Sequence, residues 1–127
     1  MIYPATPYSH PNPEVREMRF LTVNAIAAIM MAKGRMVYSP ISQSHPIALA
    51  GDLPVSWEYW EAYDRKILSI CSEVLVACQP GWKDSVGLAA EVGLARELGL
   101  TVRYITEFDA QRMALQIVDN IEGGHYA

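Results

Sequence analysis

An apolar run followed by an amphipathic helix is the feature that most constrains how this chain can fold. Residues 74–78 (VLVAC) are continuously apolar, a Pro-Gly pair follows, and residues 83–99 then repeat apolar side chains with a helical period. Asp84 or Ser85 can cap this helix, and Gly99 can end it. A buried strand that leads through a turn into a helix is the basic unit of parallel α/β folds.

This helix holds one charge in an unexpected place. At about 100° per residue, the apolar side chains of the helix surround Glu91, whereas Arg96 and Glu97 point to the opposite side. Burying a carboxylate on the face that packs against a sheet costs free energy unless the group is paired with a cation or a hydrogen-bond donor, and such a group is often kept for function. Glu91 is therefore the first candidate for a functional side chain.

The rest of the chain continues the alternation. The expected strands cover residues 1–5, 36–39, 74–78 and 101–105. The expected helices cover residues 14–33, 57–72, 83–99 and 109–120. Residues 6–13 and 40–54 are broken by prolines and polar side chains, so we expect loops there. This order predicts a doubly wound α/β fold, flavodoxin-like or Rossmann-like, with a parallel sheet of four to five strands and helices on both faces.

The composition predicts one globular domain spanning residues 1–127, because 51% of the residues are hydrophobic and 19% are charged. The net charge of −4 and the lack of a Lys/Arg cluster argue against duplex nucleic acid as a partner. No run reaches the roughly 18 apolar residues of a membrane span. The sequence has no signal-peptide pattern, and Cys71 and Cys78 fit reduced thiols, so we expect a cytoplasmic protein without a membrane partner.

Three polar residues lie within apolar helix faces, each in the first half of its helix: Asn24, Asp64 and Glu91. Each alone has a structural explanation, such as a bond to backbone or an ion pair. In a doubly wound fold, however, helices that follow strands begin at the carboxyl edge of the sheet, where ligands bind. We therefore expect the three to approach one cleft. The loops and helix start expected at the same edge carry further polar residues: Tyr8, Ser9, His10, Arg16, Ser42 and His45.

Two carboxylates in a half-apolar cleft suit chemistry at the anomeric carbon of a glycoside. One can attack or stabilise an oxocarbenium-like centre while the other handles the leaving group. A tyrosine can orient the nucleophile. Gly87 would leave room for a sugar beside Glu91, although close packing of the helix on the sheet explains a glycine equally well.

Other motifs of catalysis and cofactor binding are missing. The sequence has no G-x-G-x-x-G after the first strand, no P-loop and no G-x-S-x-G elbow. The histidines lack local metal-ligand spacing, although His10 and His45 could meet in space. We expect neither a metal nor a cofactor.

Four segments resemble a small family of uncharacterised bacterial and phage proteins over nearly the whole chain. They are residues 7–10 (PYSH), 38–47 (YSPISQSHPI), 57–65 (WEYWEAYDR) and 81–91 (GWKDSVGLAAE). That family is similar in fold to the nucleoside 2-deoxyribosyltransferases. The resemblance therefore implies a single nucleoside 2-deoxyribosyltransferase-like domain.

The resemblance also implies roles for particular residues. In the transferases and related deoxynucleotide N-glycosidases, a Glu in a small-x-Gly-x-x-x-Glu helix is the nucleophile, and Glu91 with Gly87 matches it. Asp64 matches an Asp that contacts the base, and Tyr8 would lie near the nucleophile. Transferases carry an acid where this chain has Ser85. Nucleotide hydrolases have a Ser there that helps hold the 5′-phosphate, so Ser85 favours a phosphorylated substrate or hydrolysis. Asp84, an acid one residue before Ser85, keeps the transferase reaction open as an alternative.

The expected function is that of an N-glycosidic bond hydrolase or a deoxyribosyltransferase acting on a small-molecule nucleoside or nucleotide. The alternatives are a non-catalytic nucleotide or sugar-phosphate binding module and an NAD-cleaving domain. A homo-oligomer is expected, since members of this fold commonly complete their sites across subunits. The catalytic candidates are Glu91, Asp64 and Tyr8. The substrate-binding candidates are Ser9, His10, Arg16, Asn24, Ser42, His45, Ser85 and Gly87.

Overall fold

A parallel sheet connected by helices forms the framework of the chain. The structure is a computed structural model and describes residues 1–106, 109 and 112. Within these residues three strands pair in parallel in the order β1 (Ile2–Ala5), β2 (Glu73–Ala77) and β3 (Thr101–Ile105). The α-helices there are α1 (Pro13–Ala32), α2 (Pro40–Gly51), α3 (Trp57–Ser69) and α4 (Val86–Glu97), and a short 3-10 turn, η1 (Trp82–Asp84), precedes α4. The fold is therefore mixed α/β with an open sheet.

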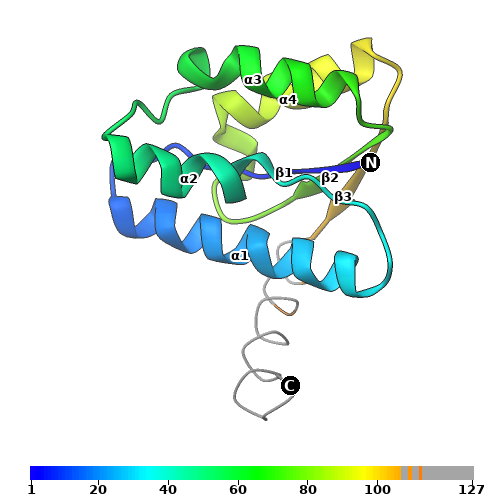
Figure 1. The fold of residues 1–127 in the computed structure, drawn as a ribbon, viewed down its shortest axis with the longest axis horizontal. Helices are drawn as coiled ribbons and strands as arrows, with labels where there is room; N and C mark the ends of the chain where they lie inside the picture. Colours follow the sequence, from blue (N-terminus) through cyan, green and yellow to red (C-terminus); the bar gives the residue numbers. More distant parts are fainter. Residues whose placement is uncertain (107–108, 110–111, 113–127) are drawn as a thin grey trace.

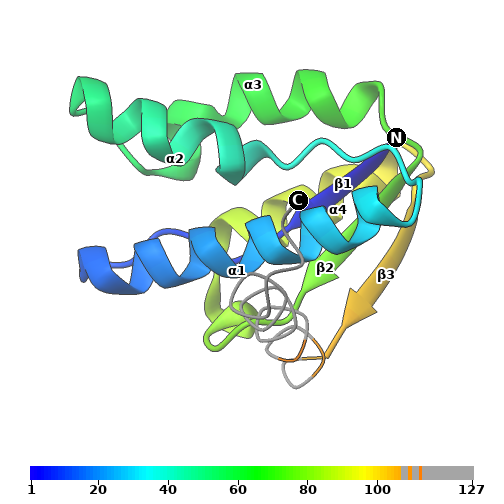
Figure 2. The same ribbon diagram turned by 60° about the horizontal axis from the view of Figure 1, so that its bottom comes forward.

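Helices cover both faces of this sheet. Figure 1 shows α3 and α4 above the strands and α1 below them, with α2 beside α1, and Figure 2 shows the same arrangement after rotation. The core on the α3 and α4 side consists of Tyr3, Ala5, Leu68, Cys71, Val74, Val76, Cys78, Leu88 and Ala95. The smaller core on the α1 side consists of Ile2, Ile26, Met30, Leu75 and Ala77. Neighbouring strand residues face opposite layers, as the two-residue period of a strand requires.

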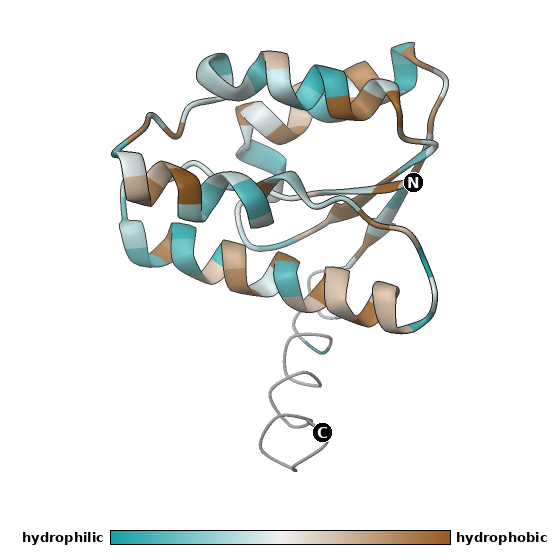
Figure 3. Ribbon diagram, viewed as in Figure 1, coloured by the Kyte–Doolittle hydropathy of each residue, from teal (hydrophilic) through white to brown (hydrophobic). Residues whose placement is uncertain are grey.

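Local signals explain where the helices begin and end. The side chain of Asn12 accepts a hydrogen bond from the N–H of Glu14 at 2.9 Å, and a proline opens α1, where no N–H is needed. Ser85 caps α4 in the same way, through the N–H of Leu88 at 3.2 Å. Gly99 follows α4 with a φ of +73°, a left-handed conformation that glycine adopts without strain. Figure 3 shows hydrophobic and hydrophilic bands alternating along the helices, as expected of helices with one face in the core.

The expected strand at residues 36–39 is reduced to one isolated bridge between Val37 and Ile2. The N–H of Ile2 donates to Met36 O and the N–H of Tyr38 donates to Ile2 O, both at 2.9 Å. Pro40 has no N–H with which to extend this pairing, and it begins a helix instead. The described residues therefore hold three strands rather than four to five.

The prediction of a loop over residues 40–54 is wrong, because α2 occupies most of this segment. Pro40 is the first helical residue, a position that suits proline, and Asp52 ends the helix with a left-handed φ of +51°. Pro46 lies inside the helix on its exposed side, while His45 and Ala48 turn inward and are buried. Burial of the inner face thus outweighs the backbone hydrogen bond that Pro46 removes.

The expected last helix, residues 109–120, lies largely outside the described residues. The N–H of Asp109 donates to Thr106 Oγ1 at 3.1 Å, a contact typical of a helix start. Within the part of the chain that the structure describes, no helix is both long and apolar enough to cross a membrane.

Candidate active site

Glu91 is a buried carboxyl group on the face of α4 that turns toward the sheet. It is 7% exposed, and the hydroxyl of Tyr3 on β1 donates a hydrogen bond to Glu91 Oε2. Burial, and secondly the charge of Asp64, raise the pKa of Glu91 to about 8, while the hydrogen bond from Tyr3 acts in the opposite direction. Burial also raises the pKa of Tyr3 well above its ordinary value, so its hydroxyl remains a donor.

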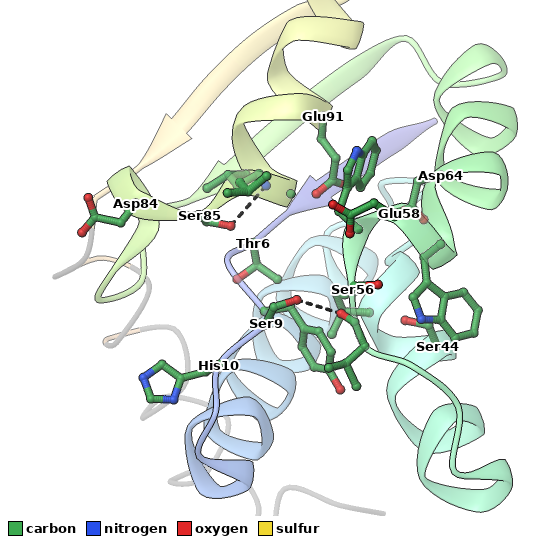
Figure 4. Close-up of a pocket in the computed structure, with 18 of the residues that line it drawn as sticks. Thr6, Ser9, His10, Ser44, Ser56, Glu58, Asp64, Asp84, Ser85 and Glu91 are labelled. Carbon is green, nitrogen blue, oxygen red and sulfur yellow. Dashed lines mark hydrogen bonds between the residues drawn. The ribbon is translucent and has the colours of Figure 1, made fainter.

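Asp64 brings a second carboxyl group to the same place from α3. Burial raises its pKa to about 6. The charge of Asp64 acts on both Glu91 and Tyr3, so the three groups form one electrostatic unit. In Figure 4 the carboxyl groups of Asp64 and Glu91 come from two helices and border the same opening. Two coupled carboxyl groups with different pKa values are the arrangement that general acid and nucleophile chemistry requires.

Both carboxyl groups line a cavity of about 530 Å³ at the carboxyl edge of β1 and β2. This volume lies in the range of small-molecule sites, roughly 300–1,000 Å³. The lining residues come from the loop after β1, from α2, from α3 and the segment before it, from η1 and from α4 with its cap: Thr6, Tyr8, Ser9, His10, Pro11, Ile41, Ser44, Val55, Ser56, Trp57, Glu58, Trp60, Asp64, Asp84, Ser85, Val86, Gly87, Leu88 and Glu91.

Gly87 lies opposite Trp57 and keeps the space between α3 and α4 open. A Cβ atom at Gly87 would lie 3.7 Å from Trp57 Cβ, which is ordinary van der Waals contact. The glycine is therefore not required by packing against the sheet. Its missing side chain adds room to the cavity, and the aromatic ring of Trp57 supplies an apolar wall.

A buried arginine holds together the two loops that leave the carboxyl edge of the sheet. From α1, the Arg19 guanidinium donates to the carbonyl oxygens of Tyr8 (3.3 Å), Ser9 (3.1 Å) and Pro80 (3.0 Å). Gln79 adds a second link, because its Nε2 donates to Thr6 Oγ1 at 2.6 Å. These bonds fix the rim of the cavity from behind.

Tyr8 lines the cavity, but its hydroxyl contacts His45 instead of Glu91. The two atoms, Tyr8 Oη and His45 Nδ1, are 2.6 Å apart, and His45 Nε2 lies 2.6 Å from Glu17 Oε2. Because the carboxylate of Glu17 only accepts, His45 Nε2 is the donor in that contact. Nδ1 is then the ring nitrogen that pairs with the Tyr8 hydroxyl. His45 is 3% exposed and stacks on Phe20, so it supports Tyr8 from behind the cavity wall.

Seven of the eleven residues predicted from the sequence line the cavity: Tyr8, Ser9, His10, Asp64, Ser85, Gly87 and Glu91. Four do not: Arg16, Asn24, Ser42 and His45. Asn24 accepts a hydrogen bond from Ser42, which joins α1 to α2 behind the cavity. Arg16 donates to the carbonyl oxygen of His10. The expectation that Asn24 would share a cleft with the two carboxyl groups is therefore wrong.

Tyr3, the hydrogen-bond partner of Glu91, is not among the site residues predicted from the sequence. A tyrosine in an otherwise aliphatic strand was the available signal, since the strand period places residues 3 and 5 on one face. The lining residues Glu58 and Ser56 at the start of α3 were also missed, because they fit the solvated first turn of any helix.

Within the described ranges, 1–106 with 109 and 112, no group of three or more His, Cys, Asp or Glu side chains is placed to hold a metal ion. His10 and His45 do not form a pair. His10 Nδ1 accepts the N–H of Asn12 at 3.0 Å, and both ring nitrogens of His45 are engaged within the protein.

The fold and the site define a class: an α/β domain with two coupled carboxyl groups in a cavity at the carboxyl edge of a parallel sheet. Residues 1–107 match the family described as Domain of unknown function (DUF1937), and the chain belongs to this family. A comparison with curated proteins finds no match. The expectation of a family without an assigned function is thus confirmed.

Proposed function

We propose that this chain cleaves or transfers the N-glycosidic bond of a nucleoside or nucleotide, with Glu91 as the nucleophile. The observation that carries the proposal is the shared cavity of Glu91 and Asp64, in which one carboxyl group is buried and bonded by Tyr3. The resemblance to the 2-deoxyribosyltransferases, in which a Glu at the position of Glu91 attacks the sugar, supports the same assignment. A doubly wound domain of that type is part of this proposal.

In the proposed reaction the Glu91 carboxylate attacks C1′ of the sugar. The bond between C1′ and the base nitrogen breaks, and its electron pair leaves with the base. Asp64 in its protonated form donates a proton to the departing base. Water, or a second base in a transfer reaction, then attacks C1′ of the glycosyl-enzyme and releases the Glu91 carboxylate, while its own proton passes to Asp64.

Burial and the charge of Asp64 favour the protonated form of Glu91, whereas Tyr3 and the open cavity are the features that suit a nucleophile. Tyr3 donates to the carboxyl group and so favours its ionised form, which is the form that attacks. The apolar ring of Trp57 and the open space at Gly87 suit the base and sugar of a nucleoside.

The proposal is tested by mixing the protein with a panel of 2′-deoxynucleosides, ribonucleosides and their 5′-monophosphates, and measuring free base by chromatography. We expect release from at least one compound by the wild type and a loss of about 10³-fold or more in Glu91→Gln. Glu97→Gln is the matched control, since this carboxylate lies on the same helix, is exposed and does not line the cavity.

Release from no compound, or release that Glu91→Gln leaves undiminished, contradicts the proposal. A thermal shift with a nucleoside but no turnover would instead favour a binding module at the same cavity.

A further inference from the structure

We infer that the cavity takes a nucleoside without a phosphate group, and that a 5′-phosphate lowers both binding and turnover. This inference rests on the proposed function and narrows its substrate class. It is carried by the charges that surround the cavity and by the hydrogen bonds that already engage the nearby cations.

The charged side chains around the cavity are almost all acidic. Glu58, Asp64, Asp84 and Glu91 line it, and none of its described lining residues is lysine or arginine. Figure 4 shows Glu58 and Asp64 on α3 and Glu91 on α4 around the opening, while Asp84 lies at the far side near Ser85. A phosphate dianion in this space would face the partly buried carboxyl group of Asp64 and the exposed carboxylates of Glu58 and Asp84.

The two arginines that contact the loop after β1 do not themselves line the cavity. Arg16 donates to the carbonyl oxygen of His10. Arg19 donates to three backbone carbonyl oxygens, and Gly81 lies so close to it that an added Cβ would be 2.8 Å from Nη2. To reach a phosphate, Arg19 would have to leave these carbonyl groups unpaired and open the cavity rim.

His10 is the one histidine among the described lining residues, and one of its ring nitrogens is already engaged by the backbone. Its Nδ1 accepts the N–H of Asn12 at 3.0 Å, which requires that nitrogen to carry no proton. A phosphate would gain no charge pairing from His10 unless this hydrogen bond broke.

Lys83 precedes α4, but it does not line the cavity, and its ammonium lies over the Trp82 ring, 5.6 Å from the centroid. The start of α4 is then the remaining lining feature that could attract an anion. A helix N-terminus is equivalent to about half a positive charge, and the Ser85 hydroxyl adds one neutral donor. The two lining carboxylates Glu58 and Asp84 outweigh this partial charge even when Asp64 is protonated. The serine that favoured a phosphorylated substrate in the sequence therefore lies in surroundings that oppose one.

Phosphate binding would also act against the nucleophile. Glu91 must lose its proton to attack, yet burial and Asp64 already raise its pKa. A bound dianion would raise the pKa of Glu91 further and reduce the ionised fraction. A neutral nucleoside imposes no such penalty.

The test compares each nucleoside with its own 5′-monophosphate, using wild-type protein for turnover and Glu91→Gln for binding by thermal shift. We expect kcat/KM to be at least about tenfold higher for the nucleoside, and a thermal shift only with the nucleoside. Added salt should narrow the difference, because it screens the repulsion.

Glu58→Gln removes one lining carboxylate and should raise kcat/KM for the monophosphate by about threefold or more relative to the nucleoside. Glu97→Gln, which removes an exposed charge outside the cavity, should leave this ratio unchanged.

A monophosphate that is cleaved or bound as well as its nucleoside overturns the inference but leaves the proposed function intact. A Glu58→Gln variant with the same ratio of kcat/KM for nucleoside and monophosphate as the wild type also overturns the inference and leaves the proposed function intact. Nucleoside binding without base release would contradict the proposed function alone, and the absence of nucleoside binding would contradict both.

Discussion

At the scale of single residues, Glu91 and Asp64 titrate as a pair. With pKa values of about 8 for Glu91 and about 6 for Asp64, the reactive state, with Glu91 ionised and Asp64 protonated, is a minor species. It is most populated between these two values. We therefore expect kcat/KM to follow a bell-shaped curve with its maximum between about pH 6 and 8.

Asp64→Asn removes the limb of the pH profile that depends on Asp64 and leaves the limb that depends on Glu91. Because it removes the neighbouring negative charge, it should lower the pKa of Glu91 and reduce kcat/KM by roughly 10²–10⁴-fold. The remaining activity should rise with pH and then level off, since only the ionisation of Glu91 is left to control it. Activity that falls with rising pH would identify Glu91 as the acid instead of the nucleophile. Steady-state kinetics between pH 5 and 9 make the comparison.

Glu91 should also lower the stability of the fold in a pH-dependent manner. Its pKa in the folded protein, about 8, lies above the ordinary value of 4.5, so the folded state holds its proton more tightly than the unfolded state. The stability that this proton confers is fully present below about pH 4.5 and is lost as the pH rises through 8. We expect Glu91→Gln to match the wild type near pH 4.5 and to exceed it by a few kcal/mol above pH 8.

Urea unfolding at several pH values measures this difference. The exposed Glu97→Gln serves as the control and should show no comparable trend. A difference between Glu91→Gln and the wild type that stays constant with pH would contradict a raised pKa at Glu91.

Two carboxyl groups of the site could be predicted because each violates a helical pattern. Glu91 and Asp64 interrupt apolar faces, and their pairing follows from helices that pack side by side on one sheet face. The contacts of Tyr8 with His45, and of His45 with Glu17, could not be predicted. These side chains come from a loop and two helices, and no periodicity relates positions across separate elements.

At the scale of elements, the link between Arg19 and the loop after β2 limits what position 81 can hold. Gly81 has a φ of +86°, and an added Cβ would lie 2.8 Å from Arg19 Nη2. Gly34 has a similar φ of +82° but nothing within 4 Å of an added Cβ. Alanine would therefore introduce backbone strain at both positions, but only at position 81 would its Cβ also clash with Arg19.

We expect Gly34→Ala to cost about 1 kcal/mol of unfolding free energy and Gly81→Ala to cost clearly more, about 2–4 kcal/mol, because Arg19 must move away from buried carbonyl groups. Chemical denaturation of the two variants checks this. Equal losses would show that the contacts of Arg19 do not hold the cavity rim.

The alternating strands and helices were predictable from the sequence, because buried apolar runs and capped periodic segments carry local signals. The expected strand at residues 101–105 matches β3, and the capping role of Ser85 is confirmed. The helix α2 was not predictable by the same reasoning, since two prolines and several polar residues resemble a loop. Its stability comes from burying His45 and Ala48 against the rest of the fold, and such tertiary contacts cannot be read from the local sequence.

At the scale of the whole molecule, the topology brings the site together. β1 and β2 are neighbours in the sheet, so the loop after β1 and the start of α4 meet at one edge. The helix α3 lies above the strands (Figure 1) and contributes lining residues to the cavity. The homo-oligomer stays a prediction from the resemblance. Light scattering in solution should give a mass of at least two chains, and a monomer would contradict it.

The central claim, that Glu91 attacks the sugar, is tested most directly by the configuration of the product. In water containing methanol, the wild type acting on a β-nucleoside should form a methyl glycoside whose configuration is read by NMR. Attack by Glu91 followed by methanol gives two inversions, and the account predicts a β-methyl glycoside. An α-methyl glycoside would mean a single direct displacement, and it would contradict the assignment of Glu91 as the nucleophile.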